Sequence, residues 1–215
     1  MNRKRHDREQ DLDLFRSKVN AYNLRLDEWT IDRLTFYRDL MVSWNDRVRL
    51  VSRADSSRIL NRHVLESMMI LKHIEPEVTR LVDIGTGGGL PGIPLHLARP
   101  DLRVSLIESA RMKALFLNEV VSSMSLGQVE VVHDRVESFS ANRAGTFDVA
   151  TSRAVASLDR VWELAEPLLK PQGALISLKG PGEAEGDLGP IGIEFSEHLI
   201  EMENRTLAVV VVRKG

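Results

Sequence analysis

The sequence predicts an α/β domain, with a mainly parallel, seven-stranded sheet, helices on both faces, an antiparallel last strand and an N-terminal helical cap. From residue 80 onward, short apolar runs alternate with helical stretches, as in βαβ units. The first of these runs ends in a glycine-rich turn. The last two strand candidates are separated by a turn near residues 203–205, which suits an antiparallel hairpin. We therefore expect a cap over residues 1–75 and a main domain over residues 76–215, joined in one compact unit.

Composition limits the class of protein. The chain has 215 residues, of which 43% are hydrophobic and 28% charged, an ordinary soluble composition that favours a single core. No run approaches the roughly 18 apolar residues of a membrane span, and the polar N-terminus lacks the apolar segment of a secretory signal. A cytoplasmic protein with no membrane partner is predicted. The absence of cysteine excludes disulfides, thiolate metal sites and cysteine nucleophiles, and no metal site is expected.

The cap is predicted to hold three helices. The first covers residues 9–21, after a polar and frayed start. The second begins at a cap formed by Asp27 or Thr30, and its apolar stripe at helical spacing is Ile31, Leu34, Tyr37, Met41 and Trp44. The third covers residues 56–73 and is capped by Ser56 or Ser57.

The connector between the second and third helices is basic. Residues 44–57 lose helical periodicity and include Arg47, Arg49 and Arg53, and Arg58 and Arg62 follow at the start of the third helix. The first 62 residues hold 14 Lys/Arg and 10 Asp/Glu, so this part is positively charged although the whole chain has a formal charge of −2. Charge alone leaves two interpretations open, a solvated helical surface or a surface for nucleic acid.

The remaining elements alternate along the chain. Strands are expected at 81–84, 104–107, 129–132, 147–151, 174–178, 199–202 and 207–212. Helices are expected at 93–98, 110–124, near 136–139 and at 158–169. In the 110–124 helix, Leu115 and Val120 or Val121 are expected to face inward. The Gly/Pro-rich segment 180–192 is interpreted as a loop.

Polar residues follow most of the predicted parallel strands. In an open parallel sheet, ligands bind beyond the carboxyl ends of the strands, where the strand order reverses. The residues placed at those ends are the glycine turn, Glu108, residues 134–136, Ser152, Arg153 and Lys179. We expect them to line a single crevice.

The glycine turn itself leaves two cofactors open. Gly87, Gly89 and Gly92 match the dinucleotide pattern G-x-G-x-x-G, and Glu108 lies 21 residues beyond Gly87, where a ribose-binding acid would stand. This pattern is also found in nicotinamide-dependent enzymes. Asp83 before the first glycine, together with the closing hairpin, instead resembles the class I S-adenosylmethionine-dependent methyltransferases. In that class a carboxylate such as Glu108 takes both ribose hydroxyls, because each hydroxyl donates to one carboxylate oxygen.

A more specific resemblance extends over nearly the whole chain. Residues 83–94, Asp-Ile-Gly-Thr-Gly-Gly-Gly-Leu-Pro-Gly-Ile-Pro, are similar to the signature of the ribosomal RNA small-subunit methyltransferase G family, also called glucose-inhibited division protein B. Further similar segments are 44–45, 62–67, 135–137, 152–154 and 178–180. The resemblance implies a Rossmann-like class I methyltransferase fold, with a helix where segment 180–192 stands. It also implies methyl transfer from S-adenosylmethionine to N7 of a guanine in small-subunit (16S) ribosomal RNA, near the decoding centre.

The resemblance implies roles for individual residues as well. Glu108 would bind the ribose of the cofactor, Val136 and Glu137 would lie at its adenine edge, and Arg153 would lie at the reacting end. The complete set of expected cofactor-binding residues is Asp83, Gly85, Gly87, Gly89, Leu90, Glu108, Val136, Glu137 and Arg153.

Methylation at guanine N7 needs few chemical groups. N7 has a lone pair and no proton, so it can attack the sulfonium methyl group without a general base, and catalysis is mostly positioning. Carbon-5 methylation of pyrimidines uses a cysteine, and exocyclic amine methylation commonly uses an Asn/Asp-Pro-Pro-aromatic motif; the chain has neither cysteine nor Pro-Pro. Arg153 and Lys179 are the candidates to orient the base through guanine O6. His63 is the candidate from the cap. A purely structural alternative for Arg153 is an ion pair with a sheet-end carboxylate such as Glu137.

The expected partner is small-subunit ribosomal RNA or the 30S particle, bound by a monomer. The predicted RNA-binding residues are Arg47, Arg49, Arg53, Arg58 and Arg62. Such contacts make binding salt-sensitive, with a slope of about −0.7 per phosphate on single strands. Two other functions stay open, an NAD-dependent oxidoreductase and a non-catalytic RNA-binding or assembly module. Asp83 and the lack of a Tyr-x-x-x-Lys pair disfavour the oxidoreductase.

Overall fold

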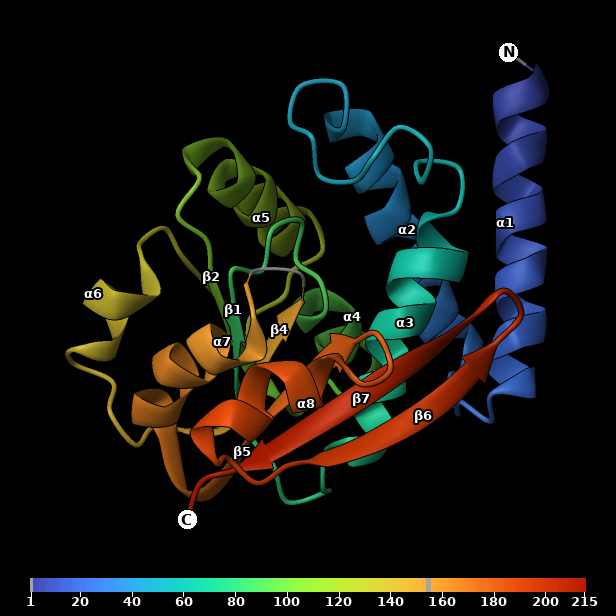
Figure 1. Ribbon diagram of the computed structural model, residues 1–215. Helices are drawn as coiled ribbons and strands as arrows, with labels where there is room; N and C mark the ends of the chain where they lie inside the picture. Colours follow the sequence, from blue (N-terminus) through green and yellow to red (C-terminus); the bar gives the residue numbers. More distant parts are fainter. Residues whose placement is uncertain (1, 154–155) are drawn as a thin grey trace.

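The computed structural model describes residues 2–153 and 156–215, with residues 2–8 as backbone only. One sheet contains seven strands in the spatial order β3-β2-β1-β4-β5-β7-β6 (Figure 1). The strands are β1 (Arg80–Ile84), β2 (Arg103–Ile107), β3 (Val129–Val132), β4 (Phe147–Arg153), β5 (Leu169–Lys179), β6 (Ser196–Met202) and β7 (Arg205–Arg213). β1 to β5 pair in parallel, and β7 pairs antiparallel with both β5 and β6. The predicted class of sheet and its reversed last strand are confirmed.

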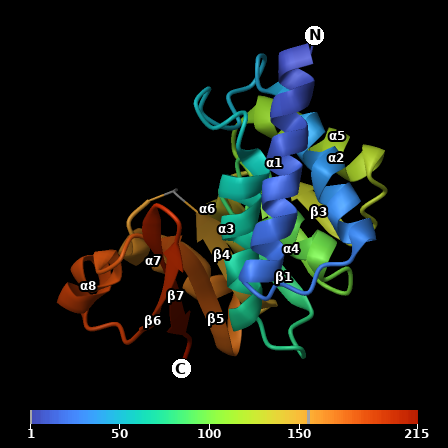
Figure 2. The same ribbon diagram turned by 90° about the vertical axis from the view of Figure 1, so that its right-hand side faces the viewer.

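Helices cover both faces of this sheet. The helices before β1 are α1 (Asn2–Ala21), α2 (Glu28–Trp44), η1 (Ile59–Val64), α3 (Leu65–Met69) and η2 (Ile70–His73). The later ones are α4 (Gly92–Ala98), α5 (Arg111–Ser123), α6 (Val136–Ser140), α7 (Leu158–Ala165), η3 (Glu166–Leu168), α8 (Glu183–Leu188) and η4 (Gly189–Ile191). In Figure 2, α1 to α5 lie on one side of the sheet, and α7 and α8 lie on the other. No helix in the described ranges is long and apolar enough to cross a membrane.

Alternating strand residues separate the core into two layers. Successive side chains of a strand point to opposite faces of a sheet. Leu81 therefore packs with the cap residues Phe15, Tyr37 and Met68 in one core, whereas Val82 packs with the α7 and α8 side in the other. The cap and the sheet thus share one continuous hydrophobic core.

The cap differs from prediction at two helix ends. The first helix begins at Asn2, well before the predicted start at residue 9. The third helical segment begins at Ile59 with a π-helical turn, and neither Ser56 nor Ser57 caps it, because the Ser56 hydroxyl donates to the carbonyl of Arg53. The start of α2 agrees with prediction, since Asp27 Oδ1 accepts a 2.8 Å hydrogen bond from the amide of Thr30.

Two further predictions about the main domain are wrong. Segment 180–192 contains the helix α8, whose buried Ala184 and Leu188 stand four residues apart and pack in the same core as α7. The glycine and proline residues at the ends of this segment favoured a loop in the sequence pattern, although the segment forms a short amphipathic helix. In α5, Val120 is buried as expected, but the side of the helix that carries Leu115 faces outward, and Leu115 is 45% exposed.

Candidate active site

The glycine turn lies at the carboxyl end of β1, in the middle of the sheet. Gly85, Gly87 and Gly89 have φ values of 64°, 61° and 92°, a left-handed region that favours glycine. A Cβ on Gly87 would meet only the carbonyl of Gly85, at 4.0 Å, whereas a Cβ on Gly89 would lie 2.6 Å from Ile93. Gly87 therefore leaves main chain open to a ligand, while Gly89 allows the turn to pack against the start of α4.

Asp83, in β1, stabilises this turn through hydrogen bonds. Its Oδ2 atom accepts hydrogen bonds from the Thr86 hydroxyl at 2.6 Å and from the amide of Gly92 at 2.8 Å. The carboxyl is fully buried, and burial raises its pKa to about 6. Its Oδ1 atom has no hydrogen-bond partner among the described residues. The contacts in the structure give Asp83 the task of shaping the turn, and direct cofactor contact stays a prediction.

Tyr37 holds the same turn from the cap. Its hydroxyl donates a 2.5 Å hydrogen bond to the carbonyl oxygen of Gly88, and the side chain is completely buried. Sequence reasoning assigned Tyr37 only to an apolar stripe. A buried tyrosine hydroxyl needs a partner, and that requirement was the available signal.

Glu108 stands beside the turn at the end of β2. Its Oε2 atom accepts from the amide of Gly87 at 2.9 Å, and its Oε1 atom accepts from the amide of Ala110 at 2.7 Å. A carboxylate has about four lone-pair positions, so each oxygen keeps capacity for one more donor. This arrangement fits a ligand diol, and the ribose role of Glu108 stays a prediction.

The remaining predicted cofactor residues occupy neighbouring positions. Leu90 is buried, with 3% of its surface exposed, directly after the glycines. Val136 is buried at the start of α6, and Glu137 beside it is exposed. Glu137 forms a 3.2 Å ion pair with Arg160, and the carboxylate that pairs with Arg153 is Glu66 instead of Glu137.

Arg153, at the end of β4, contacts His63 from the cap. Its Nη1 atom lies 3.0 Å from His63 Nδ1, and its side chain is 19% exposed. Burial, followed by the charge of Arg153, lowers the pKa of His63 to about 4, so the imidazole is neutral at physiological pH. Since a guanidinium can only donate, His63 Nδ1 is the acceptor. The structure thus brings together two of the three predicted catalytic residues.

Glu66 links Arg153 to the hairpin formed by β6 and β7. Its carboxylate lies 3.5 Å from Arg153 Nη1 and forms a second ion pair with Arg205 at the start of β7, although Glu66 is only 7% exposed. The sequence alone gave no individual role to Glu66 or to Arg205. The resemblance over residues 62–67 was a signal for Glu66, whereas no local pattern marks Arg205.

Lys179, the third predicted catalytic residue, lies on the other face of the sheet. Leu178 is the β5 neighbour of Arg153, so the next side chain along β5 points away from the cap. Lys179 Nζ donates to the carbonyl of Ala156 at 3.0 Å and lies 3.7 Å from Asp187. Its ammonium is therefore not part of the Arg153–His63 arrangement. Ala154, the last residue of the 152–154 resemblance, lies outside the described residues.

The predicted basic surface has two parts. Arg47, Arg49 and Arg53 are exposed, and their side chains pair with no residue that the structure describes. Arg58 and Arg62 both pair with Asp55. The connector that bears the first three arginines also contacts the glycine turn, because a Cβ on Gly88 would lie 3.5 Å from Leu50.

The sheet with its reversed last strand, the glycine turn and the acid at the end of the next strand define a class I S-adenosylmethionine-dependent methyltransferase. A model of the family described as GidB, rRNA small subunit methyltransferase G, matches residues 30–187. The chain belongs to this family.

Curated relatives agree with the family assignment, and each carries the name ribosomal RNA small subunit methyltransferase G. The Desulfitobacterium hafniense protein is 38% identical over 205 residues, which cover 89% of this chain and 84% of the relative. The Chromobacterium violaceum protein is 34% identical over 193 residues, which cover 83% and 91%. These relatives disfavour the NAD-dependent oxidoreductase.

Solved structures confirm the fold. A putative caffeoyl-CoA O-methyltransferase from Staphylococcus aureus superposes with a TM-score of 0.58 at 14% identity, over 92% of this chain and 98% of that chain. A SAM-dependent methyltransferase from Aquifex aeolicus gives 0.53 at 19% identity, over 67% and 88%. At such identities the likeness concerns the fold alone.

Proposed function

We propose that the protein transfers the methyl group of S-adenosylmethionine to N7 of a guanine in small-subunit ribosomal RNA. The observation that supports this most directly is the contact between Arg153 and neutral His63 beside the glycine turn, in a member of the rRNA small subunit methyltransferase G family. In such a site the arginine can orient a base by donating hydrogen bonds. The Nδ1 atom of His63 already accepts from Arg153, so it is not available to remove a proton from the base. That chemistry suits a nucleophile without a proton.

The residues around the turn fit S-adenosylmethionine. When bound, this cofactor supplies an electrophilic methyl group on a sulfonium sulfur. The open main chain at Gly87 faces its methionine portion, and the spare lone pairs of Glu108 accept from its ribose hydroxyls. Asp83 holds the turn in place. The further proposed contacts are Gly85, Gly89, Leu90, Val136, Glu137 and Arg153.

Arg153 orients the target base. Its guanidinium donates to guanine O6 or to a neighbouring phosphate and leaves N7 free to react. His63 and Glu66 hold the guanidinium in place, because Nη1 of Arg153 lies 3.0 Å from His63 Nδ1 and 3.5 Å from Glu66 Oε2. A base held in line with the methyl group reacts faster because orientation is already fixed, which contributes up to roughly 7–11 kcal/mol in favourable cases. Lys179, on the other sheet face, would have to leave Ala156 and Asp187 to assist.

The substrate is small-subunit ribosomal RNA, free or in the 30S particle, and the enzyme acts as a cytoplasmic monomer without a metal. Arg47, Arg49 and Arg53 are available for phosphates because no described residue neutralises them. They lie on the connector that contacts the glycine turn through Leu50, so RNA bound there runs past the cofactor.

Methyl transfer to small subunits that lack the modification tests this proposal. The purified protein is incubated with such subunits, or with naked 16S ribosomal RNA, and tritiated S-adenosylmethionine, and the labelled nucleoside is identified by mass spectrometry. Label in 7-methylguanosine is expected. Label in another nucleoside would refute N7 chemistry, and no label in either substrate would favour a non-catalytic RNA-binding module. Calorimetric titration with S-adenosylhomocysteine and with NAD checks the cofactor.

A further inference from the structure

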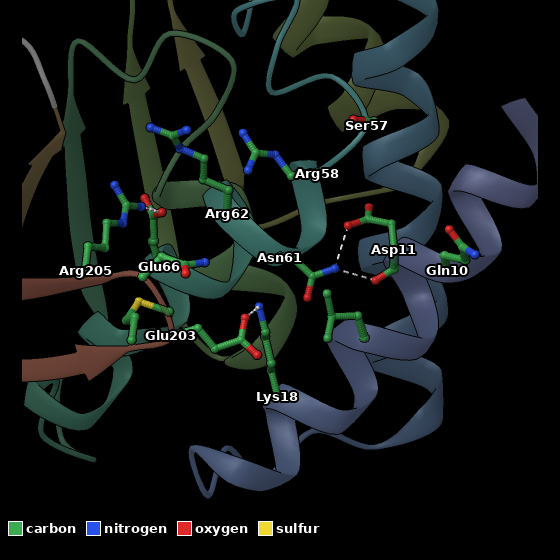
Figure 3. Close-up of a pocket in the computed structure, with 13 residues that line it drawn as sticks. Gln10, Asp11, Lys18, Ser57, Arg58, Asn61, Arg62, Glu66, Glu203 and Arg205 are labelled. Atoms are coloured by element: carbon green, nitrogen blue, oxygen red, sulfur yellow. Dashed lines mark hydrogen bonds and ion pairs between the residues drawn. The ribbon is translucent and has the colours of Figure 1, made fainter.

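A groove of about 580 Å³ lies between α1, the η1–α3 segment and the β6–β7 turn (Figure 3). It adjoins the Arg153 site because Glu66, which pairs with Arg153, lines it. Its cationic lining residues are Lys18, Arg58, Arg62 and Arg205. Figure 3 shows the three guanidinium groups gathered at one end of the groove, with Lys18 at the other.

Two of these arginines share one carboxylate. Arg62 Nη1 lies 2.7 Å from Asp55 Oδ1, and Arg58 Nη2 lies 3.4 Å from the same oxygen. The other neighbours of this carboxylate carry no charge at pH 7: the Ser52 hydroxyl donates to it at 2.7 Å, and the neutral His63 lies 3.7 Å away. Asp55 and its two arginines, which form one half of a cluster of charged residues, therefore carry one more positive than negative charge.

A second pair of arginines shares a second carboxylate. Arg153 and Arg205 approach the two oxygens of Glu66 from β4 and from the start of β7. Burial, and then the charge of Arg62, lower the pKa of Arg205, while Asp55 opposes them, so both halves lie within electrostatic range of each other. Together the two halves place four guanidinium groups on two carboxylates. Without an anion, this excess of like charge costs free energy.

The lining also indicates which part of a nucleic acid fits. No aromatic side chain is among the described residues that line the groove, so these residues give bases nothing to stack on. The Nδ2 atom of Asn61 is already used, since it donates to both the carbonyl and the carboxylate of Asp11. The charged donors at this end of the groove are guanidinium groups, whose planar fork matches phosphate oxygens.

We propose that Arg58, Arg62 and Arg205 form a phosphate-binding site for single-stranded RNA, in which the groove holds the backbone of nucleotides next to the one at Arg153. This site rests on the proposed function in so far as the bound strand is the methylation substrate. Arg205 is its new member, contributed by the β6–β7 turn and not by the cap. The Lys18–Glu203 ion pair, 2.9 Å long and partly exposed, closes the far end of the groove.

Binding of fluorescein-labelled hexauridylate by the full chain tests the site through anisotropy titrations at several salt concentrations. We expect Arg58→Gln and Arg205→Gln each to weaken binding and to reduce the salt slope by about 0.7, the value for one phosphate contact on a single strand. Arg213→Gln is the matched control, because Arg213 lies at the opposite end of the same strand as Arg205 and is 62% exposed in its side chain. Glu203→Gln should strengthen binding, since it removes a negative charge from the groove.

Several results would overturn the site. Binding and slopes of Arg58→Gln and Arg205→Gln equal to those of Arg213→Gln would do so, and Arg58, 59% exposed in its side chain, can be replaced without disturbing a core. Equally tight, equally arginine-dependent binding of hexaglutamate would point to an acidic protein partner instead. Failure of methyl transfer by the unaltered enzyme would refute the proposed function alone, because the hexauridylate titrations do not depend on turnover.

Discussion

The Nη1 atom of Arg153 lies 3.0 Å from the Nδ1 atom of His63, a contact between the end of β4 and the cap that spans 90 residues of sequence. The imidazole must be unprotonated at Nδ1 to accept this hydrogen bond. In the proposed mechanism, His63 would therefore be a positioning residue that holds the arginine and does not exchange protons with the base.

Replacement of Arg153 tests its role in orienting the base. We expect Arg153→Ala to lower methyl transfer by about 100-fold or more, the usual effect of removing an aligned donor, while RNA binding changes far less. Arg153→Lys, which keeps the charge but loses the planar fork, should give an intermediate rate. Rates are measured with labelled cofactor and binding with a labelled RNA. Full activity of the alanine variant would remove Arg153 from the mechanism.

His63 makes the stability of the protein depend on pH. Its pKa is lowered from 6.5 to about 4 by burial and by Arg153, so between these values the unfolded chain binds a proton that the folded chain does not. This contribution to stability is complete above pH 6.5 and is lost as the pH falls. Between pH 7 and pH 5 the loss should be about 2 kcal/mol.

Urea unfolding of the wild type and of His63→Gln across this pH range measures that loss. Glutamine keeps an acceptor for Arg153 but does not titrate. Asp83, whose pKa is raised to about 6, acts in the opposite direction, since its contribution falls as the pH rises from 3.8 toward 6. It is present in both proteins and cancels in the comparison. Identical pH dependence of the two proteins would contradict a buried, neutral His63.

Glu108 is expected to control cofactor affinity. Glu108→Ala should weaken S-adenosylhomocysteine binding at least about tenfold, because it removes the acceptors proposed for the ribose and those of the Gly87 and Ala110 amides. Glu108→Gln keeps one acceptor oxygen and should show a smaller loss. Isothermal titration measures both variants, and thermal melting verifies that they fold. Unchanged affinity in a folded alanine variant would refute the ribose role.

Gly92 is required for the packing of Asp83 and α4. A Cβ at this position would lie 2.5 Å from Leu106 and 2.9 Å from Asp83 Oδ2, so Gly92→Ala should destabilise the fold by about 1–3 kcal/mol. Gly186→Ala in α8 is the matched control, because a Cβ there meets nothing within 4 Å and alanine favours helix by about 0.8–1 kcal/mol. Urea unfolding of the two variants compares them. A Gly92→Ala variant as stable as Gly186→Ala would contradict the described packing.

Local patterns predicted most of the fold. The strands of the sheet and the glycine turn were found because buried parallel strands are continuous apolar runs that end abruptly in glycine. The helix α8 was missed because its apolar signal consists of only Ala184 and Leu188 between glycines and prolines. The π-helical turn at Ile59 was missed because its backbone depends on packing against α1 and α2, which no local pattern encodes.

The positions in the candidate site were predictable mainly where one strand end provides one residue. Arg153 and Glu108 were found from the rule that ligands bind beyond carboxyl ends of parallel strands. The orientation of Lys179 was missed because strand alternation places it on the other face from Arg153. Arg205 was missed because it reaches Glu66 through a hairpin whose position relative to the cap is a tertiary feature.

The hydrogen bond from Tyr37 to the carbonyl of Gly88 has a thermodynamic consequence. It joins a helix of the cap, which also holds the arginine connector, to the turn proposed to hold the cofactor. If RNA binding displaces α2, the turn must move with it, and each ligand then changes the affinity for the other by the same factor. Under that reciprocity, a cofactor that raises the affinity of the enzyme for RNA has its own affinity raised equally when RNA is bound.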